Sequence, residues 1–440
     1  MKKVITVREY ARITTDPVVA SMDCAQVSAT AFDWLCQLNE TFSRAGAALV
    51  QIEGRRWLKL DNYVGVLETP CGTQLEILPK HIESDDCVVQ SRALLRKMIQ
   101  ATMNLPTRNV GAASLELFDA PLSEWVMRQF LDALDHLIKR GMRFDYQRVE
   151  EEQRFLRGQL NMVAQMRQPP GRQHHFQIRY DVFVPDRAEN RLLKLALESV
   201  CKATQDASNW RLAHELRSLL SEVPSSRHIK DDFRKWSVDR LMAHYQPVKP
   251  WCELILNQQM PVAVSGDWRG ISLLFPMEKL FERYVGSWLK HALSADSLLT
   301  SQAASEYLCS HDGGQMFRLE PDFLVRRAEQ RWILDTKWKR LDSASKNEKY
   351  GLAQSDFYQL FAYGQKYLKG QGELVLIYPR RKAFMQALPI FNFDDHLTLR
   401  VLPFDLTNDC LIDADCTSLP FKKARSSRQD NYITIVEHAA

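Results

Sequence analysis

Ile333-Leu334-Asp335-Thr336-Lys337-Trp338-Lys339 is an apolar run interrupted by one carboxylate and two lysines. The pair Pro321-Asp322 stands in another apolar run, thirteen residues before Asp335. The pattern predicts two strands, over residues 316–326 and 331–339, with only a few polar residues between them. Because so short a connection makes two strands antiparallel neighbours, we expect Asp322 and Asp335 to meet at one end of the pair.

The polar side chains of these two strands suit the hydrolysis of a phosphodiester. Asp335 and Lys337 are two apart on a strand, so they project from the same face. Two carboxylates in an open cleft, Asp322 and Asp335, repel each other and favour binding of a divalent cation. The carbonyl of Thr336 is available as a further ligand. Magnesium needs only two or three acidic side chains, so we expect Mg²⁺ or Mn²⁺ here, with Lys337 stabilising charge or orienting water.

The triplet Asp335-Thr336-Lys337 is a weak motif by itself, since average composition yields about one such triplet by chance in a chain of this size. It is nevertheless the only triplet in the 440 residues with an acidic residue first and a lysine third. A surface hairpin with ordinary salt bridges is the competing interpretation.

Two predicted helices flank these strands. Glu282 lies beside core positions in a helix over about 276–293. Gln359 and Tyr363 are four residues apart on one face of a helix over about 355–368. Further strands are predicted near residues 305–309, 373–378 and 397–402. This order of helices and strands favours an α/β fold with a mixed sheet flanked by helices.

The rest of the chain is predicted to form two more domains, because 440 residues exceed one ordinary domain. Residues 1–84 form a β-rich N-terminal domain that includes a helix near 28–45. Residues 85–265 form an α+β middle region, with strands near 155–162 and 177–184 among its helices. Residues 266–440 are then the third domain, which carries the candidate site.

The composition excludes several classes of protein. The formal net charge is +4, from 58 basic and 54 acidic residues, so contact with DNA must come from local patches. There is no apolar run of about 18 residues and no signal-peptide pattern, so we expect a cytoplasmic protein without membrane contact. The nine cysteines contain no CxxC and no zinc-ligand spacing, which indicates reduced thiols. The dipeptide Gly-Lys is absent, so the chain has no P-loop and should bind no nucleotide itself.

Several of these motifs together resemble the McrC family, the nuclease subunits of McrBC-type, modification-dependent restriction systems. The pair Gln359 and Tyr363 also recurs in RecB-like nucleases, where it supports the active site. The resemblance covers roughly residues 85–405. The motifs that carry it are Leu280-Phe281-Glu282, Pro321-Asp322-Phe323, Ile333–Lys339 and Tyr358–Tyr363, with Leu156–Leu160, Asp181–Asp186 and Asn190–Lys194 upstream.

The resemblance implies more than the spacing shows. It implies a C-terminal PD-(D/E)xK (restriction-endonuclease-like) domain, with Glu282 as a further catalytic and metal-binding carboxylate and with Gln359 and Tyr363 in support. It implies a partner, a hexameric AAA+ GTPase of the McrB type, which binds double-stranded DNA carrying modified cytosine (5-methylcytosine). The chain is expected to engage that ring through its middle region and to stimulate GTP hydrolysis. A McrC–McrC dimer within the assembly is compatible with this scheme.

Two other interpretations remain open. The chain could be a RecB-like repair nuclease that works with a helicase, although the cysteine cluster of some such nucleases is absent. It could instead be a non-catalytic activator of an AAA+ ring. The intact set of Asp322, Asp335 and Lys337 argues against the activator, because a dead site has no reason to keep all three.

Overall fold

The computed structural model describes residues 4–44, 47–80, 88–103, 121–169, 171–172, 174–237, 239–257 and 273–422. The chain divides into two compact units, Met1–Leu280 and Phe281–Ala440. Both units mix helices with sheets, as the sequence predicted. The three-domain division at residues 84 and 265 stays a prediction.

The first unit begins with two four-stranded sheets around one helix. The strand orders are β1-β7-β6-β11 and β3-β2-β5-β4. The helix predicted near residues 28–45 is α1 (Ala29–Arg44), which buries Phe32, Leu35, Leu38 and Phe42 in the shared core. The strands are β1 (Val4–Arg8), β2 (Arg12–Thr14), β3 (Cys24–Gln26), β4 (Val50–Ile52), β5 (Trp57–Leu60), β6 (Tyr63–Glu68), β7 (Gln74–Leu78) and β11 (Leu273–Pro276).

Gly65 allows the distant strand β11 to join the first sheet. Its φ is +132°, and a Cβ built there would lie 1.9 Å from the carbonyl oxygen of Leu273. Any other residue would therefore force β6 and β11 apart, so glycine is required where these two backbones approach.

Helices make up most of the remainder of the first unit. They are α2 (Val88–Thr102), α4 (Leu122–Arg140), α6 (Ala188–Ala203), α7 (Ala207–Leu219), α8 (Ile229–Lys235), the 3₁₀ helix η1 (Arg240–Tyr245) and α9 (Lys249–Asn257). Trp125 of α4 meets Trp251 of α9 edge to face, with ring centroids 5.5 Å apart. Among the described residues of the whole chain, no helix combines the length and the apolar character needed to cross a bilayer.

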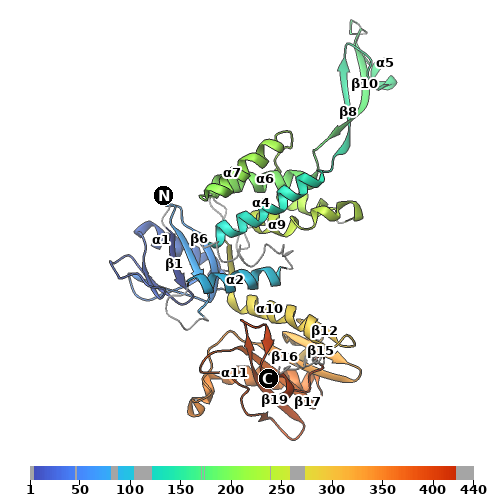
Figure 1. Cartoon of the computed structure of the whole chain (residues 1–440). Coiled ribbons are helices and arrows are strands. Elements are labelled where there is room, and N and C mark those ends of the chain that lie inside the picture. The colour runs from blue at the N-terminus through green and yellow to red at the C-terminus, as the bar shows by residue number, and fades with distance from the viewer. Residues whose placement is uncertain are drawn as a thin grey trace, which may run out of the picture. The chain divides into compact units, whose positions relative to one another are not determined.

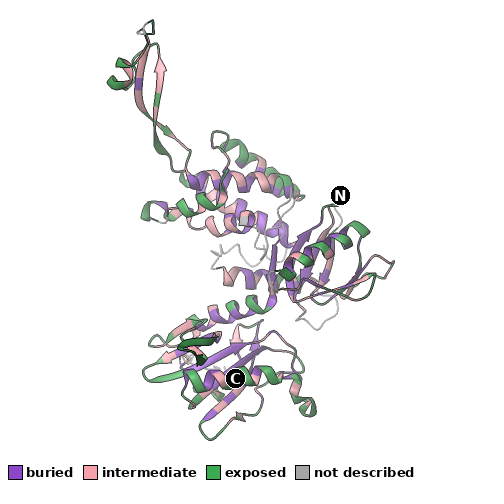
Figure 2. Cartoon of the chain, turned by 180° about the vertical axis from the view of Figure 1, so that it is seen from behind, coloured by how far each residue is buried: buried purple, intermediate pink, exposed green. Residues whose placement is uncertain are grey.

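A long ribbon leaves the helices between α4 and α6 (Figure 1). It consists of β8 (Asp145–Gln153), β9 (Gln159–Leu160), α5 (Met162–Met166) and β10 (Phe176–Val184). Figure 2 shows that most of it is exposed or only partly buried. The predicted strand at 155–162 was therefore mostly wrong. The long strand is the polar β8, which lacks apolar alternation because neither of its faces packs on a core.

The second unit is built on a mixed sheet of seven strands. The order is β12-β15-β16-β17-β19-β18, and β20 pairs with β19. β12, β15 and β16 are antiparallel neighbours, whereas β16, β17 and β19 run parallel. The elements are α10 (Met277–Ala292), which begins just before this unit, β12 (Leu298–Ser301), β13 (Glu306–His311), β14 (Gly314–Leu319), β15 (Phe323–Arg327), β16 (Gln330–Thr336), η2 (Lys346–Gly351), α11 (Gln354–Tyr367), β17 (Gly372–Pro379), β18 (Phe391–Asn392), β19 (Leu397–Asp405), β20 (Cys410–Leu411) and η3 (Ala414–Cys416).

Two strand predictions in this unit need correction. The single strand predicted over residues 316–326 is two strands, β14 and β15, separated by Glu320-Pro321-Asp322. Proline has no N–H for a ladder bond, so the strand breaks there and Asp322 lies just before β15 rather than inside a strand. The strand predicted to reach residue 339 ends at Thr336. The short edge strand β12 was not predicted.

Asp405, at the end of β19, stabilises the far part of the sheet. Its carboxylate accepts hydrogen bonds from the backbone N–H groups of Thr407 (2.8 Å) and Asn408 (3.2 Å), and it contacts the Arg380 guanidinium. Burial raises the pKa of Asp405, but the hydrogen bonds from Asn408 and Thr407 and the pairing with Arg380 outweigh burial and lower the pKa to about 2.

We expect Asp405→Asn to lower the free energy of unfolding by about 2 kcal/mol at pH 7. Because the folded-state pKa lies below the unfolded one, this contribution is complete above pH ~4 and is lost as the pH falls toward 2. Urea unfolding of both proteins should therefore show roughly half the difference at pH 3. An equal difference at both pH values would contradict the assignment.

Candidate active site

Asp322 and Asp335 lie at the same end of the β15–β16 hairpin. Phe323 pairs with Leu334, so the next position outward sets Asp322 opposite Asp335. Oδ2 of Asp322 accepts hydrogen bonds from the backbone N–H (2.7 Å) and the hydroxyl (2.6 Å) of Thr336. These two bonds tie the residue before β15 to the last residue of β16.

Lys337 turns back onto the same end of the hairpin. Its Nζ lies 2.8 Å from Oδ2 of Asp335. Its backbone N–H donates to the carbonyl of Ile377 (3.0 Å), which keeps the chain extended beyond β16. Burial by itself lowers the pKa of Lys337, but the carboxylates of Asp335, Asp322 and Asp356 outweigh it and raise the pKa. The lysine therefore stays charged.

Glu282 approaches from α10 and is linked to Asp322 through Gln302. Oε1 of the buried Glu282 accepts from Nε2 of Gln302 (3.1 Å), and the backbone N–H of Gln302 donates to the carbonyl of Asp322 (2.8 Å). Gln302 was not predicted from the sequence. No signal could have found it, because it lies in a connection whose position depends on the folded sheet.

The carboxylates of the site repel one another. Burial, followed by the charges of Asp335 and Glu282, raises the pKa of Asp322 to about 7. Burial also raises the pKa of Asp335, although the neighbouring Lys337 opposes the shift. A further positive charge would therefore favour the ionised form of both groups.

Helix α11 supports the site through the pair that the sequence singled out. Gln359 Oε1 lies 3.5 Å from Nζ of Lys337, and Gln359 Nε2 donates to the hydroxyl of Tyr363 (2.6 Å). That hydroxyl donates in turn to the carbonyl of Glu320 (3.1 Å), two residues before Asp322. Burial raises the pKa of Tyr363 to about 12, so the hydroxyl keeps its proton. Gln359 and Tyr363 thus connect Lys337 to the segment that carries Asp322.

A second ion pair, not predicted from the sequence, lies beside the first. Nζ of Lys339 is 3.0 and 3.3 Å from the two carboxylate oxygens of Asp356, a buried residue in the first turn of α11. The hydroxyl of Tyr378 also donates to Asp356 (3.4 Å). The helical spacing could have identified Asp356, because it precedes Gln359 by three residues and Tyr363 by seven and so lies on the same face of the helix.

The donor set fits a hard divalent cation. Within the described parts of the chain, no three His, Cys, Asp or Glu side chains stand ready as a metal-binding group. Oδ2 of Asp335 is buried, and the Lys337 ammonium lies 2.8 Å from it. This oxygen and the crowded Asp322 carboxylate offer the oxygen ligands that Mg²⁺ and Mn²⁺ prefer. Glu282 and the carbonyl of Thr336 are the remaining candidate ligands.

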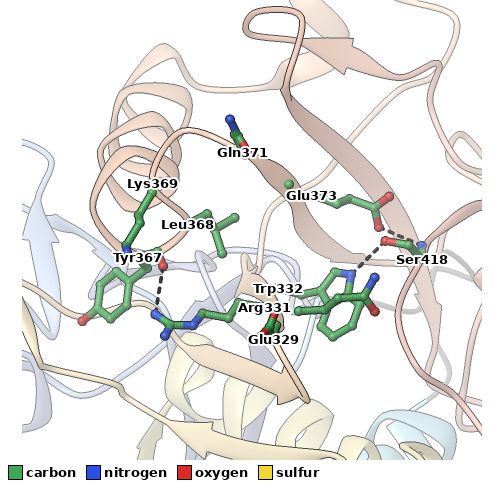
Figure 3. A pocket seen from close by; sticks show the side chains of 11 residues that line it. Glu329, Arg331, Trp332, Tyr367, Leu368, Lys369, Gln371, Glu373 and Ser418 are labelled. Carbon is green, nitrogen blue, oxygen red and sulfur yellow. Dashed lines mark hydrogen bonds between the residues drawn. The ribbon is translucent and has the colours of Figure 1, made fainter.

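A separate hollow of about 330 Å³ lies at the other end of β16 (Figure 3). Its lining includes Arg331, Trp332, Lys369, Glu373 and Ser418. Trp332 Nε1 donates to the Ser418 hydroxyl (2.8 Å), and Glu373 accepts from the Ser418 backbone N–H (3.1 Å). Its acidic side chains do not converge as those of Asp322 and Asp335 do, so this hollow is a weaker candidate than the Asp322–Asp335 end.

The profile of one protein family, described as McrBC 5-methylcytosine restriction system component, matches residues 58–379. The chain belongs to this family. All seven residues of the candidate site, from Glu282 to Tyr363, lie inside the matched region. No curated protein matches the chain.

Solved structures with a similar fold come from Thermococcus gammatolerans. A chain of a refined half-complex from a tetradecameric assembly of McrB AAA+ hexamers with bound McrC is 18% identical, with a TM-score of 0.70 over 92% of this chain and 95% of that one. A chain of the McrBC complex solved by cryo-electron microscopy is 21% identical, with a TM-score of 0.52 over 66% of this chain and 87% of that one. At these identities the likeness shows the fold.

We expect the metal-free chain to bind Mn²⁺, and Asp335→Asn to weaken that binding by at least roughly tenfold, since a ligand oxygen is lost while the shape is kept. Isothermal titration calorimetry measures the effect. Asp395→Asn, which makes the same change at an exposed position, is the matched control and should bind Mn²⁺ like the wild type. Equal affinity in Asp335→Asn and the wild type would remove Asp335 from the metal site.

Proposed function

We propose that this chain is the endonuclease subunit of a GTP-dependent restriction complex directed against DNA that carries modified cytosine. The observation that carries the proposal is the convergence of Asp322, Asp335 and Lys337 at one end of the β15–β16 hairpin, within the region that matches the restriction family. The hairpin lies in a mixed sheet between α10 and α11 in sequence, the arrangement expected of a PD-(D/E)xK nuclease domain.

The residues of the site have separate roles in the proposed hydrolysis of a phosphodiester. Asp322 and Asp335, with the Thr336 carbonyl and Glu282, would hold a divalent cation, which when bound would supply positive charge at the phosphate and activate water. Lys337 adds a fixed positive charge where negative charge develops. Asp335 and Gln359 orient its ammonium, and Tyr363 holds the carbonyl of Glu320 and so the position of Asp322.

An AAA+ GTPase of the McrB type is the partner that we propose. The solved relatives contain McrB AAA+ hexamers with bound McrC. A chain without a P-loop needs such a partner in an energy-dependent process, since it binds no GTP itself. Two copies of the chain within one assembly are compatible with this scheme.

The ribbon between α4 and α6 supports placing partner engagement and GTPase stimulation in the region before residue 266. Its distal part exposes apolar side chains, namely Phe155, Leu156, Met162, Val163 and Met166. The segment from Arg154 to Phe176 contains four arginines and no acidic residue. Exposed apolar groups gathered on one element mark interaction surfaces, and the arginines favour an acidic partner.

We expect cleavage of modified DNA by the chain and its GTPase partner to require Mg²⁺ or Mn²⁺ and to stop on addition of a chelator. Asp335→Ala should lower the cleavage rate by at least roughly a hundredfold, because the cation loses a ligand. The assay is single-turnover cleavage of methylated and unmethylated duplexes with and without the partner. Undiminished cleavage by Asp335→Ala would refute the catalytic assignment.

Lys337→Ala should separate the two roles of the chain. Cleavage should fall by about a hundredfold, because a charge that acts at the transition state is lost. Stimulation of the partner's GTPase should remain complete, because the lysine lies outside the region assigned to the partner. Steady-state GTP hydrolysis at equal protein concentrations measures this. If stimulation disappears while the variant stays folded, the two functions share one site and the division is wrong.

A further inference from the structure

Two lysines and two buried carboxylates meet where β16 ends. Lys337 pairs with Asp335 at 2.8 Å, and Lys339 pairs with Asp356 at 3.0 Å. The two lysines are separated by one residue in the chain, so both extend from the same short segment. Either lysine could in principle pair with either carboxylate, so other contacts must determine the pairing that is observed.

Asp356 is a second buried carboxylate on the helix that contacts Lys337. It is 6% exposed and lies one helical turn before Gln359, whose side chain reaches Lys337 at 3.5 Å. The charge of Asp356 already acts on Lys337 and on Asp335. The charges of both carboxylates, Asp335 and Asp356, therefore attract the ammonium of Lys337.

Lys339 satisfies Asp356 in the folded protein. Without it, the hydroxyl of Tyr378, at 3.4 Å, would be the one remaining hydrogen-bond donor to the Asp356 carboxylate among the described residues. Burying a carboxylate without a neighbouring cation costs free energy of folding. A nearby ammonium group that can reach Asp356 would therefore move to pair with it. Lys337 can do so for two reasons. Its side chain is 20% exposed, and its ammonium already lies 3.5 Å from Gln359, which is on the same helix as Asp356.

We propose that Lys339 is a positioning residue: by neutralising Asp356 it keeps the Lys337 ammonium on Asp335. The proposal rests on the proposed function, since it gives Lys337 its role in cleavage. Lys339 itself is not a catalytic residue in this scheme. It acts through Asp356, and its effect depends on the charge of that carboxylate.

The proposal predicts that a second substitution rescues the first. Lys339→Met should lower the single-turnover cleavage rate by roughly ten- to a hundredfold, the scale of a displaced catalytic group. Lys339→Met with Asp356→Asn should recover most of that loss, because the competing charge is removed. Lys366→Met, which removes an exposed lysine from the same helix, is the matched control and should cleave like the wild type. A purely structural ion pair predicts that the double variant is no faster than Lys339→Met.

A crystal structure of each metal-free variant gives a readout that does not depend on cleavage. In Lys339→Met, Nζ of Lys337 should lie within hydrogen-bonding distance of Asp356, and in the double variant it should return to Asp335. If Lys337 stays on Asp335 in Lys339→Met, or if the double variant shows no rescue, the positioning role is refuted. If the wild-type complex cuts no DNA while Lys337 changes partner as expected, the proposed function fails and the positioning role stands.

Discussion

The pairing of β15 with β16 is the constraint on which the candidate site depends. Side chains on this hairpin are buried on both faces, with Leu324, Ile333 and Leu334 fully inaccessible to solvent. Burying each such side chain contributes about 1.5–3 kcal/mol, so a slip by one residue would be strongly unfavourable. The register that this burial fixes sets Asp322 opposite Asp335. The apolar core of the hairpin thus determines where the two carboxylates meet.

Helix α11 adds the second constraint, because three of its side chains contact the segments that carry the candidate site. Asp356 contacts Lys339, Gln359 contacts Lys337, and Tyr363 contacts the carbonyl of Glu320. That carbonyl lies in the break before β15, next to the proline that ends the ladder of β14. The buried Tyr363 therefore fixes the segment between β14 and β15 to helix α11, and this fixes the position of Asp322.

The sequence predicted the elements whose pattern reflects their own burial. The parallel strands β17 and β19 are nearly continuous apolar runs, and α10 and α11 have helical periodicity, so all four were found. The polar strand β8 was missed because it packs on no core. Asp322, Asp335 and Lys337 could be grouped because Asp335 and Lys337 are two residues apart in extended chain and Asp322 follows from the geometry of the hairpin. Gln302 could not, since its contacts join elements far apart in the sequence, and the helical spacing that marks Asp356 does not identify Lys339 as its partner.

The carboxylates gathered at this end of the sheet lower the stability of the folded chain, and nothing in the packing of the fold requires them there. A raised pKa of Asp322 means that ionising this group is less favourable in the folded chain than in the unfolded one. Stability alone would favour an amide or an apolar residue at Asp322 or Asp335, as it does for buried charges generally. The lysines offset only part of the repulsion, since the pKa of Asp335 stays raised despite Lys337. The divalent cation that we propose at this site would neutralise these like charges, and this would account for a cluster that costs the fold stability.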